Sequence, residues 1–590
     1  MKKIMNSPES LIQDMSSGIV LAHPELALDS KSKVIYKKTL NPAKVSLISG
    51  GGSGHEPAHA GFVGSGLLDA AVCGDVFASP SQIQVYQAIR RVAGEKGVLL
   101  IIKNYSGDLM NFHNAARLAQ EDGIEVDYVK VDDDIAVKDS LYTVGRRGVA
   151  GTILVHKIAG AAAEAGLPLQ RVKELAQQVV SNVKSIGFAL TSCTVPAKGT
   201  PTLVLGEEEI EYGVGIHGEP GIHRETLVNA QELAGRMVMS LCNELQIKVG
   251  KPSRVAVLVN GFGGTPLMEL YVLHKEVMRE LHEKGITVAR SFVGNYMTSL
   301  DMSGSSISLL KLDDTLEGWL NAPCKAPALQ VTGPVPEVAY QDFFTASQSE
   351  QSVSYQVETP AEHGVIGTKL TLENMMYLVD VMSDSIIRNE IPFCELDSYA
   401  GDGDFGMSVA KGFKQLKREW NGIISQPSLD IGAFLVECSL VIMEHCGGAS
   451  GPIWGSAFRA AGKHTVGKAT LTISEFADML QVAVKGIQAT GERSFGRGAV
   501  VGDKTLIDAL VPCANTWTSC ASEHVGWAEA FVRGAKAAMD GAERTKEIVA
   551  RLGRAGTVGD RSLGHPDAGA YGLGVIFSDI ANAIKSRENQ

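Results

Sequence analysis

The strongest constraint on the fold is a change of pattern between the two halves of this 590-residue chain. Up to about residue 325, short β-rich runs alternate with helical stretches. Several runs are nearly continuous aliphatic segments, as expected for strands buried on both faces of an α/β sheet; they lie at residues 45–48, 98–102, 126–129, 255–259 and 307–310. From about Leu370 onward, apolar residues recur every three or four positions and alanine is frequent. This half is predicted to be an all-α domain.

A segment rich in proline and polar residues separates the two patterns. It contains four prolines and the polar stretch 345–352, a composition typical of an interdomain linker. We therefore expect an α/β domain at 1–325, a linker at 326–362 and an all-α domain at 363–590. A division of the first domain near residue 185 would give two α/β subdomains.

Composition narrows the class of protein. The formal net charge of −12 argues against a nucleic-acid-binding surface, because phosphate backbones favour basic patches. The nine cysteines are dispersed and form no C-x-x-C pair, which is typical of reduced thiols in the cytosol. The first residues contain no apolar core of signal-peptide length, and no run approaches the ~18 apolar residues of a membrane helix. We expect a cytoplasmic protein that binds neither nucleic acid nor membrane.

Glycine-rich turns follow several of the expected strands and carry reactive side chains. His55 ends the turn at 50–55, Lys103 and Asp108 bound the turn that follows the strand at 98–102, and His217 lies in a glycine-bounded loop. Ligands of open α/β sheets bind beyond the carboxyl ends of strands, so these turns are candidate walls of one site. A neutral imidazole is a nucleophile toward a ketone, and an aspartate accepts a proton from a hydroxyl. The alternative for any single histidine is a structural or solvated side chain.

The second half contains an acidic cluster, Asp397, Asp402 and Asp404, in a glycine-punctuated turn. Mg²⁺ is usually held by one or two carboxylates with phosphates and waters, so three aspartates could seat two ions against a polyphosphate. The alternative is an Asx-rich turn with solvated carboxylates. The small residues at 447–451 favour either phosphate binding by backbone amides or close helix packing. A glycine-rich loop at 496–505 could cover a nucleotide.

Taken in series, these motifs resemble the dihydroxyacetone kinase family. SGGGSGHEP at 49–57, KNYSGD at 103–108 and GIHGEPG at 215–221 are similar to the substrate domain of that family. Asp397 with GDGD at 401–404, GGASG at 447–451 and GDKT at 502–505 are similar to its nucleotide domain. The resemblance covers nearly the whole chain, in the same order. It implies a phosphotransferase with an alcohol group as acceptor, in which an α/β substrate region precedes an all-α helical-barrel nucleotide domain.

For the substrate domain, the resemblance implies that His217 attacks the ketone carbon and holds the substrate as a covalent hemiaminal. Such capture selects short-chain ketoses, either dihydroxyacetone or a tetrulose such as erythrulose, over glycerol, which has no carbonyl. Asp108 would accept the proton of the terminal hydroxyl, and His55 would orient the substrate. The remaining pocket residues would be Gly52, Ser53, Gly54 and Lys103.

For the nucleotide domain, the resemblance implies ATP and two Mg²⁺ ions, the ions being held by Asp397, Asp402 and Asp404. The nucleotide-binding residues would be Asp402, Gly403, Asp404, Phe405, Ala449, Ser450, Gly496, Thr505, Leu506, Asp567, Ala568 and Gly569. The sheet domain of this family dimerises, and the helical domain of one chain serves the substrate domain of its partner. A homodimer with domain exchange is therefore expected.

Three positions depart from the family pattern. Leu109 stands where many ATP-dependent members have arginine, Lys504 stands where arginine is commoner, and Ala449 replaces a usual serine. The first departure could alter substrate preference, and the other two could weaken nucleotide binding.

Alternatives remain open for the donor and for the reaction. The stretch 130–140 resembles the form of the family that takes phosphate from a phosphotransferase-system protein, whereas fusion to a nucleotide domain favours ATP. A non-catalytic ketose sensor would keep capture by His217 without transfer. A lyase acting on flavin dinucleotide with a divalent metal would not need His217.

Overall fold

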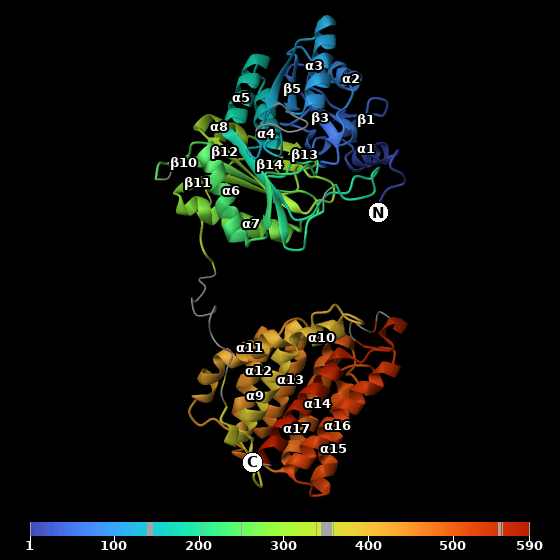
Figure 1. Ribbon diagram of the computed structural model, residues 1–590, viewed down its shortest axis with the longest axis vertical. Coiled ribbons are helices and arrows are strands. Elements are labelled where there is room, and N and C mark those ends of the chain that lie inside the picture. The colour runs from blue at the N-terminus through green and yellow to red at the C-terminus, as the bar shows by residue number, and fades with distance from the viewer. Residues whose placement is uncertain are drawn as a thin grey trace. The chain divides into compact units, whose positions relative to one another are not determined.

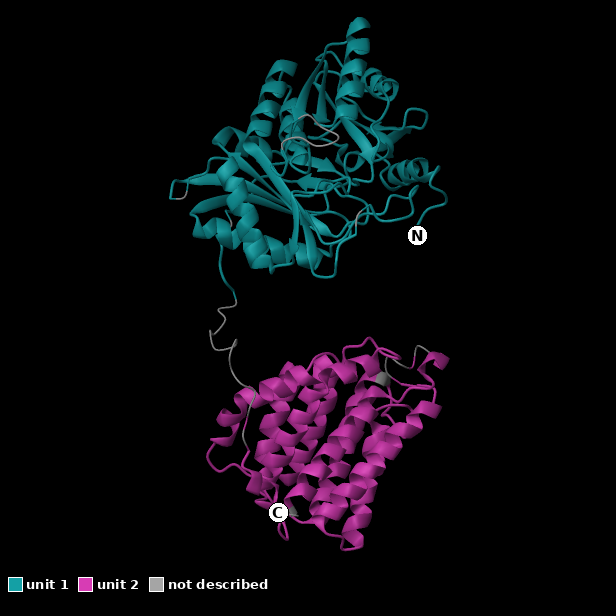
Figure 2. Cartoon of the chain, in the orientation of Figure 1, with its two compact units in different colours: residues 1–343 teal, residues 344–590 magenta. Residues whose placement is uncertain are grey.

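The chain forms two compact units, residues 1–343 and residues 344–590 (Figure 2). The computed structural model describes residues 2–137, 145–202, 204–248, 250–337, 339–343, 357, 359–552, 556 and 559–588. The first unit contains two six-stranded sheets with helices, and the second is mostly helical (Figure 1). The predicted order of an α/β region followed by a helical region is therefore confirmed.

The first sheet combines four parallel strands with an antiparallel edge. Its order is β1 (Leu26–Asp29), β2 (Val34–Lys37), β4 (Ala70–Val76), β3 (Ser46–Ser53), β5 (Val98–Lys103) and β6 (Val126–Val131). Strands β4, β3, β5 and β6 run parallel. All residues of β3 and β5 are buried, as their aliphatic runs predicted. One face packs on α2 (Gln82–Val92) and α3 (Ser106–Glu121), and the other on α4 (Thr152–Glu164) and α5 (Leu169–Asn182).

The second sheet is mainly antiparallel. Its order is β11 (Ile286–Gly294), β10 (Ser253–Gly261), β12 (Gly304–Leu312), β7 (Val183–Ala189), β8 (Glu209–Tyr212) and β9 (His223–Thr226). Only β10 and β11 pair in parallel within it. One face packs on α6 (Ala230–Glu244) and α7 (Leu267–Glu283). The other face joins α1 (Leu11–Ala22), α4, α5, α8 (Asp314–Asn321) and the first sheet in one shared core, so the expected division near residue 185 falls in β7, inside a continuous unit.

A hairpin extends the first unit beyond the expected domain end at residue 325. It consists of β13 (Cys324–Ala326) and β14 (Leu329–Val331). The amide of Lys325 donates to the carbonyl of Ser65, and Leu329 and Val331 are buried. The linker predicted at 326–362 thus begins inside this hairpin, while its polar stretch 345–352 lies outside the described residues.

The second unit is built from helices that pack in series. They are α9 (Leu372–Arg388), α10 (Glu390–Asp397), α11 (Phe405–Ile424), α12 (Ile431–His445), α13 (Ser450–Thr465), α14 (Ile473–Phe495), α15 (Ile507–Ser522), α16 (Trp527–Arg544) and α17 (Ala568–Glu588). From α11 onward each helix packs on the next, and α9 packs on both α11 and α17. Helices α9 and α14 begin at capping boxes, in which Thr371 and Thr472 accept from the third residue of the helix.

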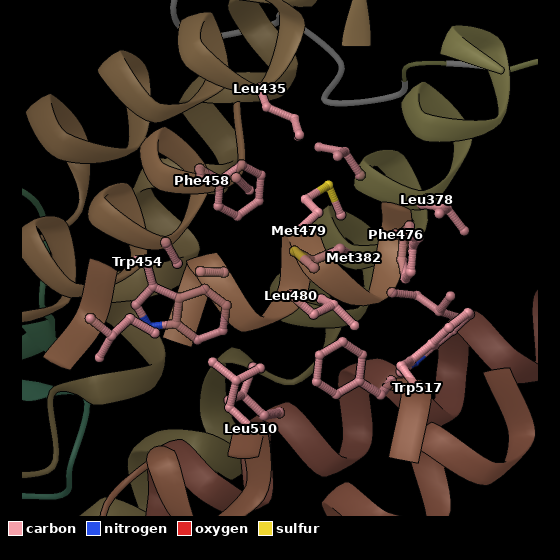
Figure 3. Close-up of a pocket in the computed structure, with 18 of the residues that line it drawn as sticks. Leu378, Met382, Leu435, Trp454, Phe458, Phe476, Met479, Leu480, Leu510 and Trp517 are labelled. Atoms are coloured by element: carbon pink, nitrogen blue, oxygen red, sulfur yellow. The ribbon is translucent and has the colours of Figure 1, made fainter. Parts of the chain in front are cut away.

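The apolar faces of these helices surround a cavity of about 130 Å³ (Figure 3). Its lining is almost wholly apolar and includes Leu378, Met382, Trp454, Phe476 and Trp517. Of the apolar residues that recur at helical spacing along α9, Val379 and Ile386 are buried, whereas Leu372, Met376 and Met382 are partly buried. Within the part of the chain that the structure describes, no helix is both long and apolar enough to cross a bilayer.

An ion pair buried in the first unit provides a test of its packing. Lys44 Nζ lies 2.6 Å from Asp69 Oδ2, and each side chain is only 1% exposed. The same oxygen accepts the amide hydrogen of Leu47 in β3. We expect Asp69→Ala to lower the unfolding free energy of the first unit by about 3–5 kcal/mol, because Lys44 keeps a buried charge without compensation.

Chemical denaturation, followed through the transition of the first unit, measures this loss. The control is Asp75→Ala, which breaks the ion pair of Lys33 with a carboxylate that is 73% exposed; it should cost less than about 1 kcal/mol. Equal losses in the two variants would contradict the prediction.

Candidate functional site

The first unit gathers four of the predicted side chains beyond the carboxyl ends of its strands. His55 lies two residues after β3, Lys103 ends β5, and Asp108 lies in the first turn of α3. His217 lies in the loop that joins β8 to β9. These four residues define what we call the histidine pocket, and their positions follow the rule for ligand sites in α/β sheets.

The two histidines of the pocket contact each other directly. Nε2 of His55 lies 3.1 Å from Nε2 of His217. Nδ1 of His55 lies 2.8 Å from the carbonyl oxygen of Thr298, in the loop between β11 and β12. A carbonyl oxygen only accepts, so Nδ1 of His55 carries the hydrogen. Burial, with the charges of His217 and Lys103, lowers the pKa of His55 well below its ordinary value. His55 is therefore neutral, its Nε2 is an acceptor, and the hydrogen between the rings belongs to His217.

Lys103 and Asp108 form the second pair of the pocket. Lys103 Nζ lies 3.1 Å from Asp108 Oδ2, and both side chains are buried. The hydroxyl of Ser79 donates to the other carboxylate oxygen, Oδ1, over 2.5 Å. A Cβ added at Gly51 would lie 2.4 Å from Lys103 Nζ, so only glycine leaves space for the ammonium. The pair is thereby held in one orientation.

The glycine-rich end of β3, with Gly54 directly after it, serves mainly to let other segments approach. A Cβ added at Gly52 would lie 2.6 Å from the amide nitrogen of Ala78, and one at Gly54 would lie 2.8 Å from the ring of Phe77. The hydroxyl of Ser53 donates to the carbonyl of Gly74 in β4. The predicted residues Gly52, Ser53 and Gly54 therefore shape the pocket, and the Ser53 side chain is engaged by the sheet.

Aromatic rings that sequence reasoning did not single out enclose His217. The ring centroids of Tyr105 and Phe77 lie 4.6 and 5.1 Å from that of His217. Tyr105 lies within the KNYSGD motif and could have been found there. Phe77, Ser79 and Thr298 come from other loops and carry no motif, so only the fold brings them to the site.

A second, buried histidine pair lies near Lys103. Nδ1 of His59 is 3.0 Å from Nε2 of His156 and 3.3 Å from the hydroxyl of Ser49. Burial, with a further contribution from the charge of Lys103, lowers the pKa of His156 from its ordinary value of 6.5 to about 3. Burial also lowers the pKa of His59 well below its ordinary value, with further contributions from the charges of Lys103 and His156. Both rings are therefore neutral at physiological pH.

The second unit places the three predicted aspartates together between α10 and α11. One carboxylate oxygen from each of Asp397, Asp402 and Asp404 lies within 4.8 Å of the others. Asp397 Oδ2 accepts the amide hydrogen of Gly403 over 2.9 Å, and a Cβ at Gly401 would lie 2.2 Å from Asp397 Oδ1. Three carboxylates this close repel one another unless a cation lies among them. Hard oxygen ligands with this spacing fit Mg²⁺.

A cavity of about 490 Å³ opens beside these aspartates. Its lining includes most of the predicted nucleotide residues: Asp402, Asp404, Phe405, Ala449, Ser450, Thr505, Leu506, Asp567, Ala568 and Gly569. Gly403 and Gly496 are not among the lining residues; Gly496 caps the carboxyl end of α14 in a left-handed conformation, with φ 75°. The lining also includes Gly447 and Gly448, which precede α13; the Gly447 amide donates to the carbonyl of Ser408.

Lys504 anchors the wall of this cavity. Its Nζ donates to the carbonyl oxygens of Thr545 and His565, at 2.9 and 2.8 Å, and to that of Ser562. Burial lowers its pKa. The ammonium thus fastens the segment that leads to Asp567, whose own pKa is raised to about 7, chiefly by burial.

Comparisons with known proteins relate both units to one family. Residues 17–328 match the Dak1 domain and residues 399–582 the DAK2 domain. A putative 3,4-dihydroxy-2-butanone kinase of Solanum lycopersicum is 36% identical over 605 residues, which covers 100% of this chain and 99% of that protein. The dihydroxyacetone-binding subunit of a PTS-dependent dihydroxyacetone kinase of Listeria innocua is 51% identical over 322 residues, which covers 54% of this chain and 97% of that subunit.

A solved structure extends the similarity to three dimensions. The dihydroxyacetone kinase of C. freundii in complex with AMP-PNP and Mg²⁺ is 31% identical and has a TM-score of 0.59. The match covers 98% of this chain and 99% of that one.

The neutral histidine pair makes the first unit sensitive to acid. The unfolded chain protonates His156 below pH 6.5, whereas the folded unit does so only near pH 3. The contribution of this residue to stability is thus complete above pH 6.5 and is lost as the pH falls, by about 1.4 kcal/mol per pH unit. We expect His156→Gln to flatten the fall in unfolding free energy between pH 6.5 and 5.

Denaturant titrations at several pH values measure this slope. His223→Gln is the control, because that side chain is 50% exposed and water solvates its charged form. An unchanged slope in His156→Gln would show that the ring is already charged in the folded unit.

Proposed function

The chain belongs to the dihydroxyacetone kinase family and is a phosphotransferase that acts on an alcohol group, and we propose that it transfers the γ-phosphoryl group of ATP to a terminal hydroxyl of a short-chain ketose. The proposal rests on one observation above all. The same chain carries two facing imidazoles and, in its other unit, a carboxylate cluster beside a cavity of nucleotide size. Dihydroxyacetone and tetruloses such as erythrulose are the proposed substrates.

Capture of the ketose is assigned to His217. When Nε2 of His217 bonds to the carbonyl carbon, the hydrogen on that nitrogen passes to Nε2 of His55, which lies 3.1 Å away. His55 then gives the proton to the carbonyl oxygen, which becomes the hydroxyl of the hemiaminal. Glycerol, which has no carbonyl, is not captured in this way. Covalent capture also orients the substrate, an effect worth up to about 7–11 kcal/mol in well-aligned systems.

Proton removal from the terminal hydroxyl is assigned to Asp108. The donors Lys103 and Ser79 each hold one of its carboxylate oxygens, which fixes the plane of the carboxylate. An oriented carboxylate accepts a hydroxyl proton as the oxygen attacks phosphorus.

ATP and Mg²⁺ are assigned to the second unit. Asp397, Asp402 and Asp404 would hold two Mg²⁺ ions, which supply charge neutralisation on the phosphates. Ala449 and Ser450 would lie against the phosphates, and Asp567, Ala568 and Gly569 against the nucleoside. The chain of helix contacts from α9 through α17 and back to α9 supports the helical-barrel architecture. We further propose a homodimer in which the helical unit of one chain serves the substrate unit of its partner.

The donor distinguishes two versions of this function. The relative from Listeria innocua is named as PTS-dependent, and its similarity covers only the first unit. The present chain also carries the unit that matches the DAK2 domain, with its carboxylate cluster. This second unit favours ATP over a phosphocarrier. Residues 138–140 of the stretch that resembles the phosphocarrier-dependent form lie outside the described residues.

Substitutions in the second unit should abolish phosphoryl transfer without abolishing formation of the ketose adduct in the first unit. We expect Asp402→Asn to lower turnover at least about 100-fold, because one charge-neutralising ligand is lost, while the ketose adduct still forms. His217→Ala should abolish both adduct and turnover. Intact-mass spectrometry detects the adduct, and a coupled assay measures turnover.

The matched control is Asp540→Asn, on the exposed surface of α16. It should leave adduct and turnover unchanged. Full turnover in Asp402→Asn would refute the metal assignment, and a metal-dependent reaction that survives His217→Ala would indicate the lyase.

A substrate panel with purified protein tests the donor and the ketose together. We expect turnover with MgATP alone on dihydroxyacetone or an erythrulose, with no product from glycerol. The coupled assay measures each rate, and chelation of Mg²⁺ should remove it. Turnover only after addition of a phosphorylated carrier protein would replace ATP as the donor.

A further inference from the structure

We propose that Glu219, held by Arg147, keeps a hydrogen on Nδ1 of His217 and thereby makes Nε2 the nucleophilic nitrogen. The inference rests on the proposed capture of a ketose by His217. It assigns Glu219 a positioning role in addition to the groups that touch the substrate.

Glu219 lies against His217 from the side opposite to His55. Its Oε2 accepts the amide hydrogen of His217 over 2.8 Å, and its Oε1 lies 3.8 Å from Nδ1 of the ring, within ion-pair range. A Cβ added at Gly215 would lie 2.1 Å from Glu219 Oε1, so glycine at this position leaves space for the Glu219 carboxylate. The loop between β8 and β9 therefore folds back on itself and brings Glu219 next to His217.

Arg147 fixes this carboxylate from a distant part of the chain. Its guanidinium lies 3.3 Å from Glu219 Oε1, donates to the carbonyl of Gly213 over 2.8 Å and donates to Asp134 Oδ2 over 2.7 Å. Its side chain is 1% exposed. Burial alone would raise the pKa of Glu219, but the neighbouring His217 and the charge of Arg147 outweigh it and lower the pKa to about 2. Glu219 is thus an anion at any physiological pH.

The two ring nitrogens of His217 therefore face two acceptors. Nε2 faces the lone pair of His55, and Nδ1 faces the Glu219 carboxylate. Tyr105 and Phe77 contact the His217 ring with their own rings. An imidazole with a hydrogen on both nitrogens satisfies this arrangement.

This arrangement balances the capture step without any further reactant. The step starts from a ring with a hydrogen on each nitrogen, and hence one positive charge, which is the form that the two facing acceptors favour; Nε2 becomes nucleophilic only as its hydrogen leaves. The Nε2 hydrogen leaves through His55 to the carbonyl oxygen, the lone pair of Nε2 forms the bond to carbon, and the π bond of the carbonyl breaks. In the product the ring keeps the Nδ1 hydrogen and its charge, so the ion pair with Glu219 persists throughout. Without Glu219, the ring cation would share a buried site with the Arg147 cation, which disfavours the adduct.

The test is Glu219→Gln in the full chain, which keeps the size of the side chain and an acceptor for the His217 amide but removes the charge. With ¹³C-labelled dihydroxyacetone, we expect the equilibrium ratio of adduct to free ketose to fall by about 10- to 100-fold. In the ¹⁵N spectrum of histidine-labelled protein, the Nδ1–H signal of His217 should be lost. His217→Ala assigns that signal. A purely structural effect would not change which nitrogen carries the hydrogen.

Glu211→Gln is the matched control. Glu211 is a buried carboxylate that supports the same loop, since it accepts the amide hydrogen of Gly221 over 2.7 Å and pairs with Arg224. We expect its adduct ratio and its His217 signal to equal those of the unsubstituted chain. An equal loss in the two variants would assign the effect to loop stability and overturn the inference.

The outcomes separate this inference from the function on which it rests. Absence of an adduct in the unsubstituted chain would overturn capture itself. A normal adduct in both the unsubstituted chain and Glu219→Gln would leave capture intact and overturn the role of Glu219. If Glu219→Gln does not fold, Glu219→Asp gives the same comparison, because its shorter side chain moves the carboxylate away from Nδ1. The adduct ratio and the Nδ1–H signal should then fall together. A normal adduct ratio without that signal would overturn the inference.

Discussion

The hydrogen bond between Nδ1 of His55 and the carbonyl of Thr298 determines the hydrogen positions in the histidine pocket. His55 lies just after β3 of the first sheet and Thr298 in a loop of the second, so segments of both sheets together fix one tautomer. The backbone of the same two residues is also paired, because the Thr298 amide donates to the His55 carbonyl. Since His55 then offers only an acceptor to His217, the hydrogen between the two rings belongs to Nε2 of His217. In the capture step that we propose, this hydrogen leaves through His55, so the shared core of the two sheets would serve the proposed chemistry as well as stability.

Much of this arrangement was predictable from local sequence, and the rest depends on long-range packing. Glycine turns after aliphatic runs predicted where His55, Lys103 and Asp108 lie, because strand ends converge at one edge of a sheet. The spacing of Asp397, Asp402 and Asp404 predicted their cluster. Arg147, Ser79 and Thr298 reach the pocket from separate segments and carry no local signal. The boundary predicted at residue 325 divides the hairpin Cys324–Val331, because its strands are too short to show an alternating pattern and Pro327 suggests a break.

The two sites differ in how they treat charge. In the histidine pocket, His55, Lys103 and Asp108 are all buried, so an unbalanced charge there costs more than in water. The carboxylate cluster of the second unit lies at an open cavity, where Asp402 is exposed and a cation can enter with its waters. The deeper wall of that cavity is apolar, since it shares Ile453, Trp454, Ile487 and Leu506 with the cavity enclosed by the helices. A polyphosphate bound in this cavity would thus lie between the carboxylate oxygens on one side and apolar side chains on the other.

The departures from the family pattern acquire different meanings once their surroundings are known. Lys504 stands at φ 62°, and its ammonium donates to the backbone carbonyls of Thr545, Ser562 and His565. An arginine has a planar, forked head that would not fill the same three-carbonyl site, so the lysine suits these three acceptors. Leu109 packs with the apolar cluster between the first sheet and α2 and α3. Any effect on substrate preference would therefore act through the position of α3, which carries Asp108.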